Sequence, residues 1–316
     1  MANLLDSTKK YLSHAQQQRS LYTMTPKEVR RLRANAPKFE LTEEVPLKIE
    51  DRDIVVRDGG QILIRIYTPI GNGPFPIIIY YHGGGWVLND IETCDASCQL
   101  LAAETNSIVI SVGYRLAPEF QFPIPLYDAY DAFLWTAKTA QSINGLVNEI
   151  TVMGDSAGGN LATVVTIMNR ELSGPSIKGQ VLLYPVTDLS FATGSYHEFA
   201  EGFGLLKKDM EWFAQYYLHE TESYNNPYVA PLQAENLEHL PSSCIIVAEN
   251  DVLNDEGKAY AQRLKEFGNH VELHIANGLV HSFFTKNEFF SKEIDETIKK
   301  VSTFLASNKD GLDSAV

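Results

Sequence analysis

The residues of this chain best suited to nucleophilic chemistry lie in one short motif, Gly154-Asp155-Ser156-Ala157-Gly158. An apolar, β-branched run at 150–153 precedes the motif, and residues 161–165 follow it in a pattern typical of a helix. Glycines two positions before and after the serine let a strand turn sharply into a helix, because larger side chains there would collide. Such a turn presents the hydroxyl at a helix N-terminus, where partial positive charge favours developing negative charge. The motif therefore predicts that Ser156 is a nucleophile.

A second motif, His82-Gly83-Gly84-Gly85-Trp86, follows directly after the apolar run at 77–81. One interpretation of three consecutive glycines is a flexible turn without a functional role. They also let backbone N–H groups face an oxyanion with no side chain in the way, which a serine attacking a carbonyl group requires. Because a histidine followed by three glycines is rare at average glycine usage, we favour the second interpretation.

Both motifs resemble those of the hormone-sensitive-lipase-like carboxylesterases, a branch of the α/β-hydrolase fold. Two further segments match the same family, Tyr114-Arg115-Leu116-Ala117-Pro118-Glu119 and Leu183-Tyr184-Pro185, and the resemblance runs from about residue 50 to the end of the chain. It implies a serine carboxylesterase that needs no cofactor or metal and acts on short- to medium-chain acyl or aryl esters through an acyl-enzyme. The implied oxyanion hole uses the backbone N–H of Ala157 and those of two among Gly83, Gly84 and Gly85. The sequence leaves open which two.

The candidate general base is His281. The chain order in this fold is nucleophile, acid, then histidine. Of the eight histidines, only His281 lies in a loop after the last predicted strand, since His274 is inside that strand and His270 precedes it. His281 would take the proton of Ser156 and return it to the leaving alkoxide.

The candidate acid is Asp251, which follows the apolar run at 244–248. The family places its acid just past this strand, in a pattern like Asp-Pro-Leu-x-Asp, and here Val252 replaces the usual proline. Asp251 would hold the histidine tautomer and stabilise its cation. Asp255 is the competitor, and a structural role at a helix start suits it better. Ser282 also departs from the family, which often has glycine after the catalytic histidine.

Short apolar runs alternate with longer helical stretches through most of the chain. Continuous β-branched runs without alternation are typical of strands covered on both faces, as in a parallel sheet. Asp58-Gly59-Gly60 between two further runs predicts a hairpin. We expect an α/β fold with about eight mostly parallel strands and helices on both faces. The predicted strands are 54–57, 62–67, 77–81, 108–112, 150–153, 181–184, 244–248 and 271–275.

Two segments are expected to form a helical cap over the site. Residues 1–48 read as polar helices, with a capping-box start at Thr25-Pro26-Lys27-Glu28, and residues 49–316 form the catalytic domain. An insertion at about 189–227 contains an amphipathic helix, 205–218, with an aromatic face. Core packing and a lid over the site explain that face about equally well. In the lid interpretation, an aromatic pocket is lined by Trp86, Trp212 and Phe213.

Composition excludes several other functions. The formal charge of −14 argues against nucleic-acid and membrane-surface partners. Residues 1–20 contain no apolar run long enough for a signal-peptide core, and no stretch of the chain reaches the length of a membrane span. The three cysteines are too few for a disulfide framework, so a cytoplasmic location is expected, and Cys94 and Cys98 are predicted to be packing residues. No dinucleotide, P-loop or zinc-protease motif occurs.

The expected partner is a small-molecule ester, and the family resemblance also permits a homodimer. Two other functions stay open from the sequence alone. The first is an amidase, peptidase or transferase that uses the same three residues. The second is a ligand-binding receptor on the same scaffold, although such receptors usually lose a catalytic residue and this chain keeps Ser156, Asp251 and His281.

Overall fold

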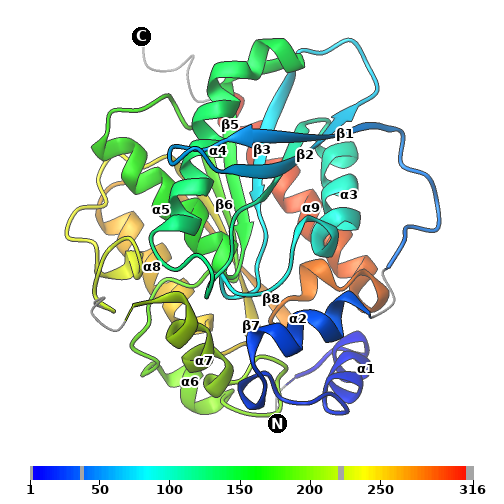
Figure 1. The fold of residues 1–316 in the computed structure, drawn as a ribbon, viewed down its shortest axis with the longest axis vertical. Helices are drawn as coiled ribbons and strands as arrows, with labels where there is room; N and C mark the ends of the chain where they lie inside the picture. The colour runs from blue at the N-terminus through cyan, green and yellow to red at the C-terminus, as the bar shows by residue number, and fades with distance from the viewer. Residues whose placement is uncertain (1–2, 36–38, 220–223, 311–316) are drawn as a thin grey trace.

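The computed structural model describes residues 3–35, 39–219 and 224–310, and one eight-stranded sheet runs through them (Figure 1). The strand order is β1-β2-β4-β3-β5-β6-β7-β8. Neighbours from β4 to β8 are parallel, whereas β2 is antiparallel to both β1 and β4. The expectation of about eight mostly parallel strands is confirmed. The strands are β1 Leu47–Val55, β2 Gln61–Pro69, β3 Phe75–Tyr81, β4 Ile108–Gly113, β5 Gly145–Asp155, β6 Gly179–Leu183, β7 Ser242–Asn250 and β8 Val271–Val280.

Both edge strands are longer than predicted. β1 begins at Leu47, because an edge strand tolerates the mostly charged residues 48–53, which pair with β2. β8 continues past Ile275 through Gly278 to Val280 and pairs with β7 up to Asn250. Polar and small residues hide both extensions from a pattern based on apolar runs. The hairpin between β1 and β2 is as predicted, with the N–H of Val56 donating to Gly60 O at 2.9 Å.

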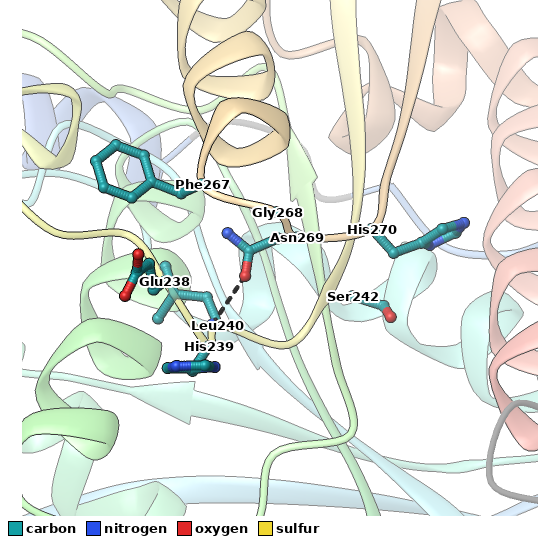
Figure 2. Close-up of a pocket in the computed structure, with 8 residues that line it drawn as sticks. All are labelled: Glu238, His239, Leu240, Ser242, Phe267, Gly268, Asn269 and His270. Carbon is teal, nitrogen blue, oxygen red and sulfur yellow. Dashed lines mark hydrogen bonds between the residues drawn. The ribbon is translucent and has the colours of Figure 1, made fainter. Parts of the chain in front are cut away.

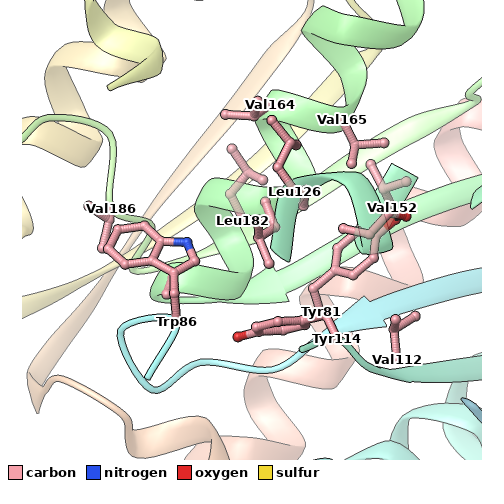
Figure 3. Close-up of a cluster of buried hydrophobic side chains, with 14 of the residues drawn as sticks. Tyr81, Trp86, Val112, Tyr114, Leu126, Val152, Val164, Val165, Leu182 and Val186 are labelled. Atoms are coloured by element: carbon pink, nitrogen blue, oxygen red, sulfur yellow. The ribbon is translucent and has the colours of Figure 1, made fainter. Parts of the chain in front are cut away.

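Helices cover both faces of the sheet, as predicted (Figure 1). On one face, Ile77, Ile79 and Tyr81 of β3 join a core cluster with residues of α4, α5 and α8; Figure 3 shows part of it. On the other face, Ile78 and Tyr80 join a cluster with residues of α3 and α9. The strand alternation explains this division. The helices are α1 Asp6–Ala15, α2 Pro26–Ala34, α3 Asp95–Thr105, α4 Ile124–Thr139, α5 Ala157–Glu171, α6 Gly194–Glu198, α7 Lys207–Tyr217, α8 Asn254–Glu266 and α9 Asn287–Asp310, with 3-10 turns η1 Leu21–Thr23, η2 Ile91–Cys94, η3 Ala140–Ile143, η4 Pro231–Gln233 and η5 Phe283–Thr285.

The N-terminal helices pack against late parts of the chain. Thr25 and Glu28 form the predicted capping box at the start of α2. The indole Nε1 of Trp212 on α7 donates to Met24 O at 2.9 Å, and the hydroxyl of Thr8 on α1 donates to Gly278 O of β8 at 2.7 Å. The predicted boundaries at 48 and at 189–227 stay predictions. The contact between Trp212 and Met24 joins the two predicted cap segments, and the contact between Thr8 and Gly278 joins the first of them to β8.

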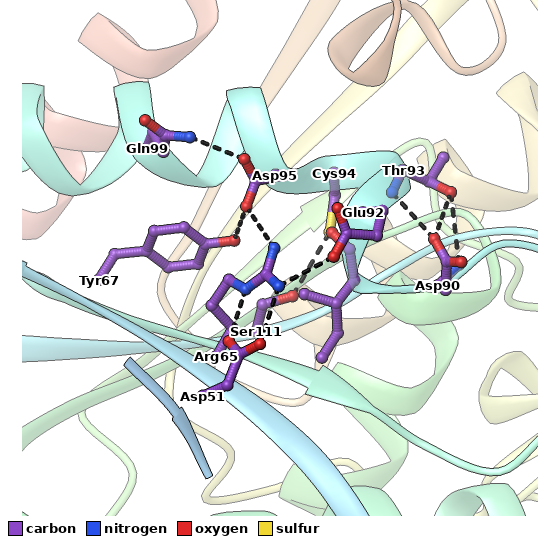
Figure 4. A network of polar contacts seen from close by, with 11 residues as sticks. Asp51, Arg65, Tyr67, Asp90, Glu92, Thr93, Cys94, Asp95, Gln99 and Ser111 are labelled. Atoms are coloured by element: carbon purple, nitrogen blue, oxygen red, sulfur yellow. Dashed lines mark hydrogen bonds and ion pairs between the residues drawn. The ribbon is translucent and has the colours of Figure 1, made fainter. Parts of the chain in front are cut away.

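Arg65 of β2 anchors the antiparallel end of the sheet to α3 (Figure 4). Its guanidinium forms ion pairs with Asp51 at 2.6 Å, Glu92 at 2.9 Å and Asp95 at 2.9 Å. Several partners on a largely buried arginine form a network, which contributes more than isolated surface pairs do. The network fixes the end of the loop that connects β3 to α3. Cys98 of α3 and the preceding Cys94 are buried free thiols.

Candidate active site

Ser156 occupies the sharp turn that its flanking glycines predict. β5 ends at Asp155, α5 begins at Ala157, and Ser156 between them has φ 56° and ψ −119°. A Cβ on Gly154 would lie 2.2 Å from Gly158 O, and one on Gly158 would lie 1.9 Å from Tyr81 O. Both positions therefore require glycine. The strained serine conformation costs on the order of 1–3 kcal/mol, and such strain is found mainly at functional sites.

The structure brings Ser156, His281 and Asp251 together. Nε2 of His281 lies 2.9 Å from Oγ of Ser156, and Nδ1 lies 2.6 Å from Oδ2 of Asp251. Asp251 and His281 directly follow the ends of β7 and β8, and Ser156 follows the end of β5. The carboxyl ends of parallel strands meet at one edge of a sheet. Ser156 and Asp251, which are 95 positions apart, and Asp251 and His281, which are 30 positions apart, therefore become neighbours.

All three side chains are buried, with exposed fractions of 5% for Ser156, 5% for His281 and 1% for Asp251. The N–H of Leu253 donates to Oδ1 of Asp251 at 3.1 Å, which fixes the carboxylate. With Asp251 ionised, Nδ1–H of His281 donates to it, and Nε2 is left to accept the serine proton. The arrangement is able to generate a nucleophilic alkoxide.

Asp255, the competing acid, lies elsewhere. Its Oδ2 accepts the N–H of Ser195 at 2.8 Å, in the first turn of α8. It therefore joins α8 to α6, and Asp251 is the aspartate that contacts His281. Ser282 has φ 63°, a left-handed conformation that glycine adopts without strain. That conformation explains why glycine suits the position after the histidine.

The first glycine of the His82–Gly85 loop has a fixed partner. The N–H of Gly83 donates to Oδ1 of Asp155 at 2.8 Å, and the hydroxyl of Tyr80 donates to the same oxygen at 2.8 Å. A Cβ on Gly83 would lie 2.4 Å from Oδ2 of Asp155. The loop thus rests on the residue directly before Ser156.

The next two glycines differ from the first. Gly84 has φ 116° and Gly85 φ 61°. In the part of the chain that the structure describes, no acceptor is found for the N–H of Gly84, Gly85 or Ala157. Free backbone donors beside a nucleophile are what stabilisation of an oxyanion requires.

Asp155 takes part in the site although the sequence did not predict a role for it. It is only 3% exposed, and burial raises the pKa of its carboxyl although Tyr80 and Gly83 both donate to it. A position between an apolar strand and a serine at a helix start is unusual for an acidic residue. That placement is the feature of the sequence that could have indicated a role for Asp155. Asn89 supports the loop from its other side, since its Nδ2 donates to Gly83 O at 3.2 Å.

The three aromatic residues expected to line a pocket are all nearly buried. Trp86 is fully buried and stacks on Tyr217, with ring centroids 4.1 Å apart; Figure 3 shows it pointing away from the loop into the core cluster. Trp212 packs edge-on against Phe213 at 5.2 Å. A Cβ on Gly85 would lie 2.1 Å from the Phe213 ring, so that ring covers the loop directly. Phe213 thus packs directly against Gly85, one of the glycines of this loop.

An open hollow of about 460 Å³ lies apart from this site (Figure 2). It is formed by residues 238–242 and 267–270, which precede β7 and β8. Asp251 and His281 follow the opposite ends of the same strands. The hollow therefore lies at the other edge of the sheet, and none of the candidate site residues lines it.

Comparisons with known proteins agree with this geometry. A family model described as alpha/beta hydrolase fold matches residues 78–285. Carboxylic ester hydrolase LipN of Mycobacterium tuberculosis is 42% identical over 230 residues, which cover 71% of this chain and 61% of that protein. Ethyl acetate hydrolase of Pseudomonas putida is 34% identical over 80% of each chain. A thermostable esterase from Pseudomonas putida ECU1011 superposes with a TM-score of 0.91 at 30% identity, over 98% of both chains. Within the described ranges, no helix has the length and hydropathy needed to cross a bilayer.

Proposed function

We propose that this chain, which belongs to the hormone-sensitive-lipase-like carboxylesterases of the α/β-hydrolase fold and is a carboxylic ester hydrolase, acts through an acyl-enzyme on Ser156. The observation that carries the mechanism is the continuous chain of contacts from Ser156 Oγ through the His281 ring to Asp251. Each of these side chains is buried, so the contacts are not weakened by competition with bulk water.

The reaction proceeds in two halves. Ser156 Oγ attacks the ester carbonyl carbon while Nε2 of His281 takes the hydroxyl proton. The tetrahedral intermediate then collapses, the bond to the alcohol oxygen breaks, and His281 returns the proton to that oxygen. In the second half, His281 takes a proton from water, the resulting hydroxide attacks the acyl carbon, and Ser156 leaves with the proton. The products are the alcohol and the carboxylic acid.

The proposed oxyanion donors are the N–H groups of Gly84, Gly85 and Ala157. Gly83 is left out because its N–H already donates to Asp155. We therefore assign the role to the second and third glycines of the loop, and the lack of any other acceptor for their N–H groups among the described residues supports this assignment. Each such donor contributes about 3–4 kcal/mol to transition-state stabilisation in other hydrolases.

The proposed substrates are esters with short to medium acyl chains or aryl groups. Ser156 is only 5% exposed, and the Phe213 ring packs on the loop beside it, which favours small acyl groups. Relatives of this chain bear the names ethyl acetate hydrolase and arylesterase. A cytoplasmic location and a homodimer stay predictions.

The test is hydrolysis of p-nitrophenyl esters with acyl chains from two to sixteen carbons. Ser156→Ala should lower kcat by about 10⁶-fold, as loss of the nucleophile does elsewhere. Ser142→Ala is the matched control, because Ser142 is exposed on η3 and its hydroxyl, among the described residues, bonds only to Thr139 O. Turnover by Ser156→Ala comparable to that of the control would refute the mechanism. A maximum beyond ten carbons would refute the substrate range, and faster cleavage of anilides than of matched esters would indicate an amidase.

A further inference from the structure

Three potential metal ligands gather on the outer part of the sheet, on the face that α9 covers. Cys244 of β7 pairs directly with Glu272 of β8, and His274 follows two residues later. Partners in register and residues two apart point to the same face of a sheet. One ligand atom from each of the three residues lies within 4.8 Å of the others.

The spacing of these atoms suits a small tetrahedral cation. Oε2 of Glu272 and Nε2 of His274 are 3.5 Å apart. Two ligands at about 2.0–2.1 Å from a tetrahedral Zn²⁺ are separated by roughly 3.4 Å, so this pair already has the required distance. No separation in the group is larger than 4.8 Å, so the excess over that value is at most about 1.4 Å, which side-chain rotation is able to close.

His274 supplies an independent observation. Its Nε2 atom is buried and has no hydrogen-bond partner among the described residues. Buried polar atoms are nearly always satisfied, and an unsatisfied one needs an explanation such as an ion. This ring nitrogen, which points toward Glu272, is therefore free to coordinate a metal ion through its lone pair.

A route from solvent leads to the group. A groove of about 330 Å³ runs between β8 and α9, and Cys244, which is fully buried, lies outside its lining. An ion entering the groove would meet the carboxylate and the imidazole first and the sulfur last. A water molecule from the groove would complete four-fold coordination. The groove is lined by Glu272, His274, Glu296, Lys299, Lys300 and Thr303.

We propose that Cys244, Glu272 and His274 form a Zn²⁺ site that is separate from the catalytic centre. Binding forms a Zn–S bond and releases the thiol proton to solvent, and the thiolate and carboxylate together neutralise the two charges of the ion. Cys244 lies seven residues before Asp251 along β7, which at about 3.3 Å per residue places the two roughly 20 Å apart. The ion would act as a clamp between the edge strand β8 and its neighbour, without a part in ester hydrolysis.

The proposal is tested on the full-length, metal-free protein titrated with Co²⁺, the spectroscopic substitute for Zn²⁺. One equivalent should produce the near-ultraviolet charge-transfer band of a cobalt–thiolate bond, and Zn²⁺ should abolish it by competition. The band should be lost in Cys244→Ser and kept in Cys98→Ser, the matched control with another buried thiol. His274→Gln should weaken binding by at least about tenfold, since even loss of an outer partner has that effect.

Two further readouts separate this proposal from the esterase mechanism. Zn²⁺ should raise the Tm of the wild type and leave that of Cys244→Ser unchanged, because only a ligand of the folded state stabilises it. All these variants should keep wild-type hydrolysis, which also shows that they fold. If Cys244→Ser does not fold, His274→Gln decides alone, because its ring is partly exposed. Absence of a cobalt band in the wild type, or a band that persists in Cys244→Ser, would overturn the proposal.

Discussion

Replacing Asp209 by asparagine should make the stability of this protein less dependent on pH. Asp209 is only 3% exposed and lies in the first turn of α7. Its carboxylate accepts the N–H groups of Leu206 at 3.2 Å and of Tyr22 at 3.3 Å, and so it joins α7 to η1. Burial raises the pKa of this carboxyl from 3.8 to about 6, against the opposing effect of the two hydrogen bonds.

The direction of the effect follows from the pKa values of the two states. Because the folded pKa is the higher one, protonation stabilises the folded protein. That stabilisation is complete below about pH 4, where an unfolded aspartate also binds its proton, and it is lost as the pH rises through about 6. A difference of about 2.2 pKa units at 1.36 kcal/mol per unit corresponds to a loss of about 3 kcal/mol. This is a large part of the 5–15 kcal/mol that stabilises a typical domain.

The assay is urea unfolding of the wild type and of Asp209→Asn between pH 4 and pH 8. Asparagine keeps the volume and one acceptor oxygen but does not titrate. The free energy of unfolding of the variant minus that of the wild type should therefore rise by about 3 kcal/mol across this range. Glu211→Gln, on the exposed face of the same helix, is the control for net charge. A difference between Asp209→Asn and wild type that stays the same at pH 4 and pH 8 would refute the reasoning.

Three predictions concern the site itself, and initial-rate assays with p-nitrophenyl acetate check each of them. Asp251→Asn should lower kcat by about 10⁴-fold through the wrong histidine tautomer, whereas Asp255→Asn should lower only stability; equal losses would contradict the assignment. Asp155→Ala should leave two buried donors unpaired and reduce kcat by about 10²-fold with KM little changed, and Asp155→Asn should recover most of that loss, since its Oδ1 still accepts. Gly85→Ala should nearly abolish turnover because its methyl group meets the Phe213 ring, and activity within about twofold of wild type would show that the loop yields easily.

The strand pattern and the turn at Ser156 were visible in the sequence because both depend on local spacing, whereas Asp251 and His281 were predicted from the chain order of the fold that the motifs resemble. Buried strands show as unbroken apolar runs, and Gly154 is required by a clash within the turn itself. Gly158 is required for a different reason, because a Cβ there would meet Tyr81 O of β3. β8 was predicted to end at Ile275, five residues early, since Asn277 and Gly278 interrupt the run and only pairing with β7 extends the strand.

The parts that the sequence did not reveal depend on side-chain direction across the fold. Nothing local indicates that the carboxylate of Asp155 turns back to Gly83, a residue 72 positions earlier, and thereby distinguishes one glycine of the loop from the other two. The same holds for Trp86, which follows these glycines in sequence but stacks on Tyr217 of α7. Aromatic residues beside a motif are therefore weaker indicators of a pocket than the motif is of a reaction.

The contact between Thr8 and Gly278 has a consequence for how the protein matures on the ribosome. These residues are 270 positions apart, so α1 leaves the ribosome long before the strand on which it docks. At roughly 5–20 residues per second, the delay is about 14–54 s. His281 is made only three residues after Gly278. The nascent chain therefore acquires the proposed base and a docking place for its first helix together, once translation has passed β8.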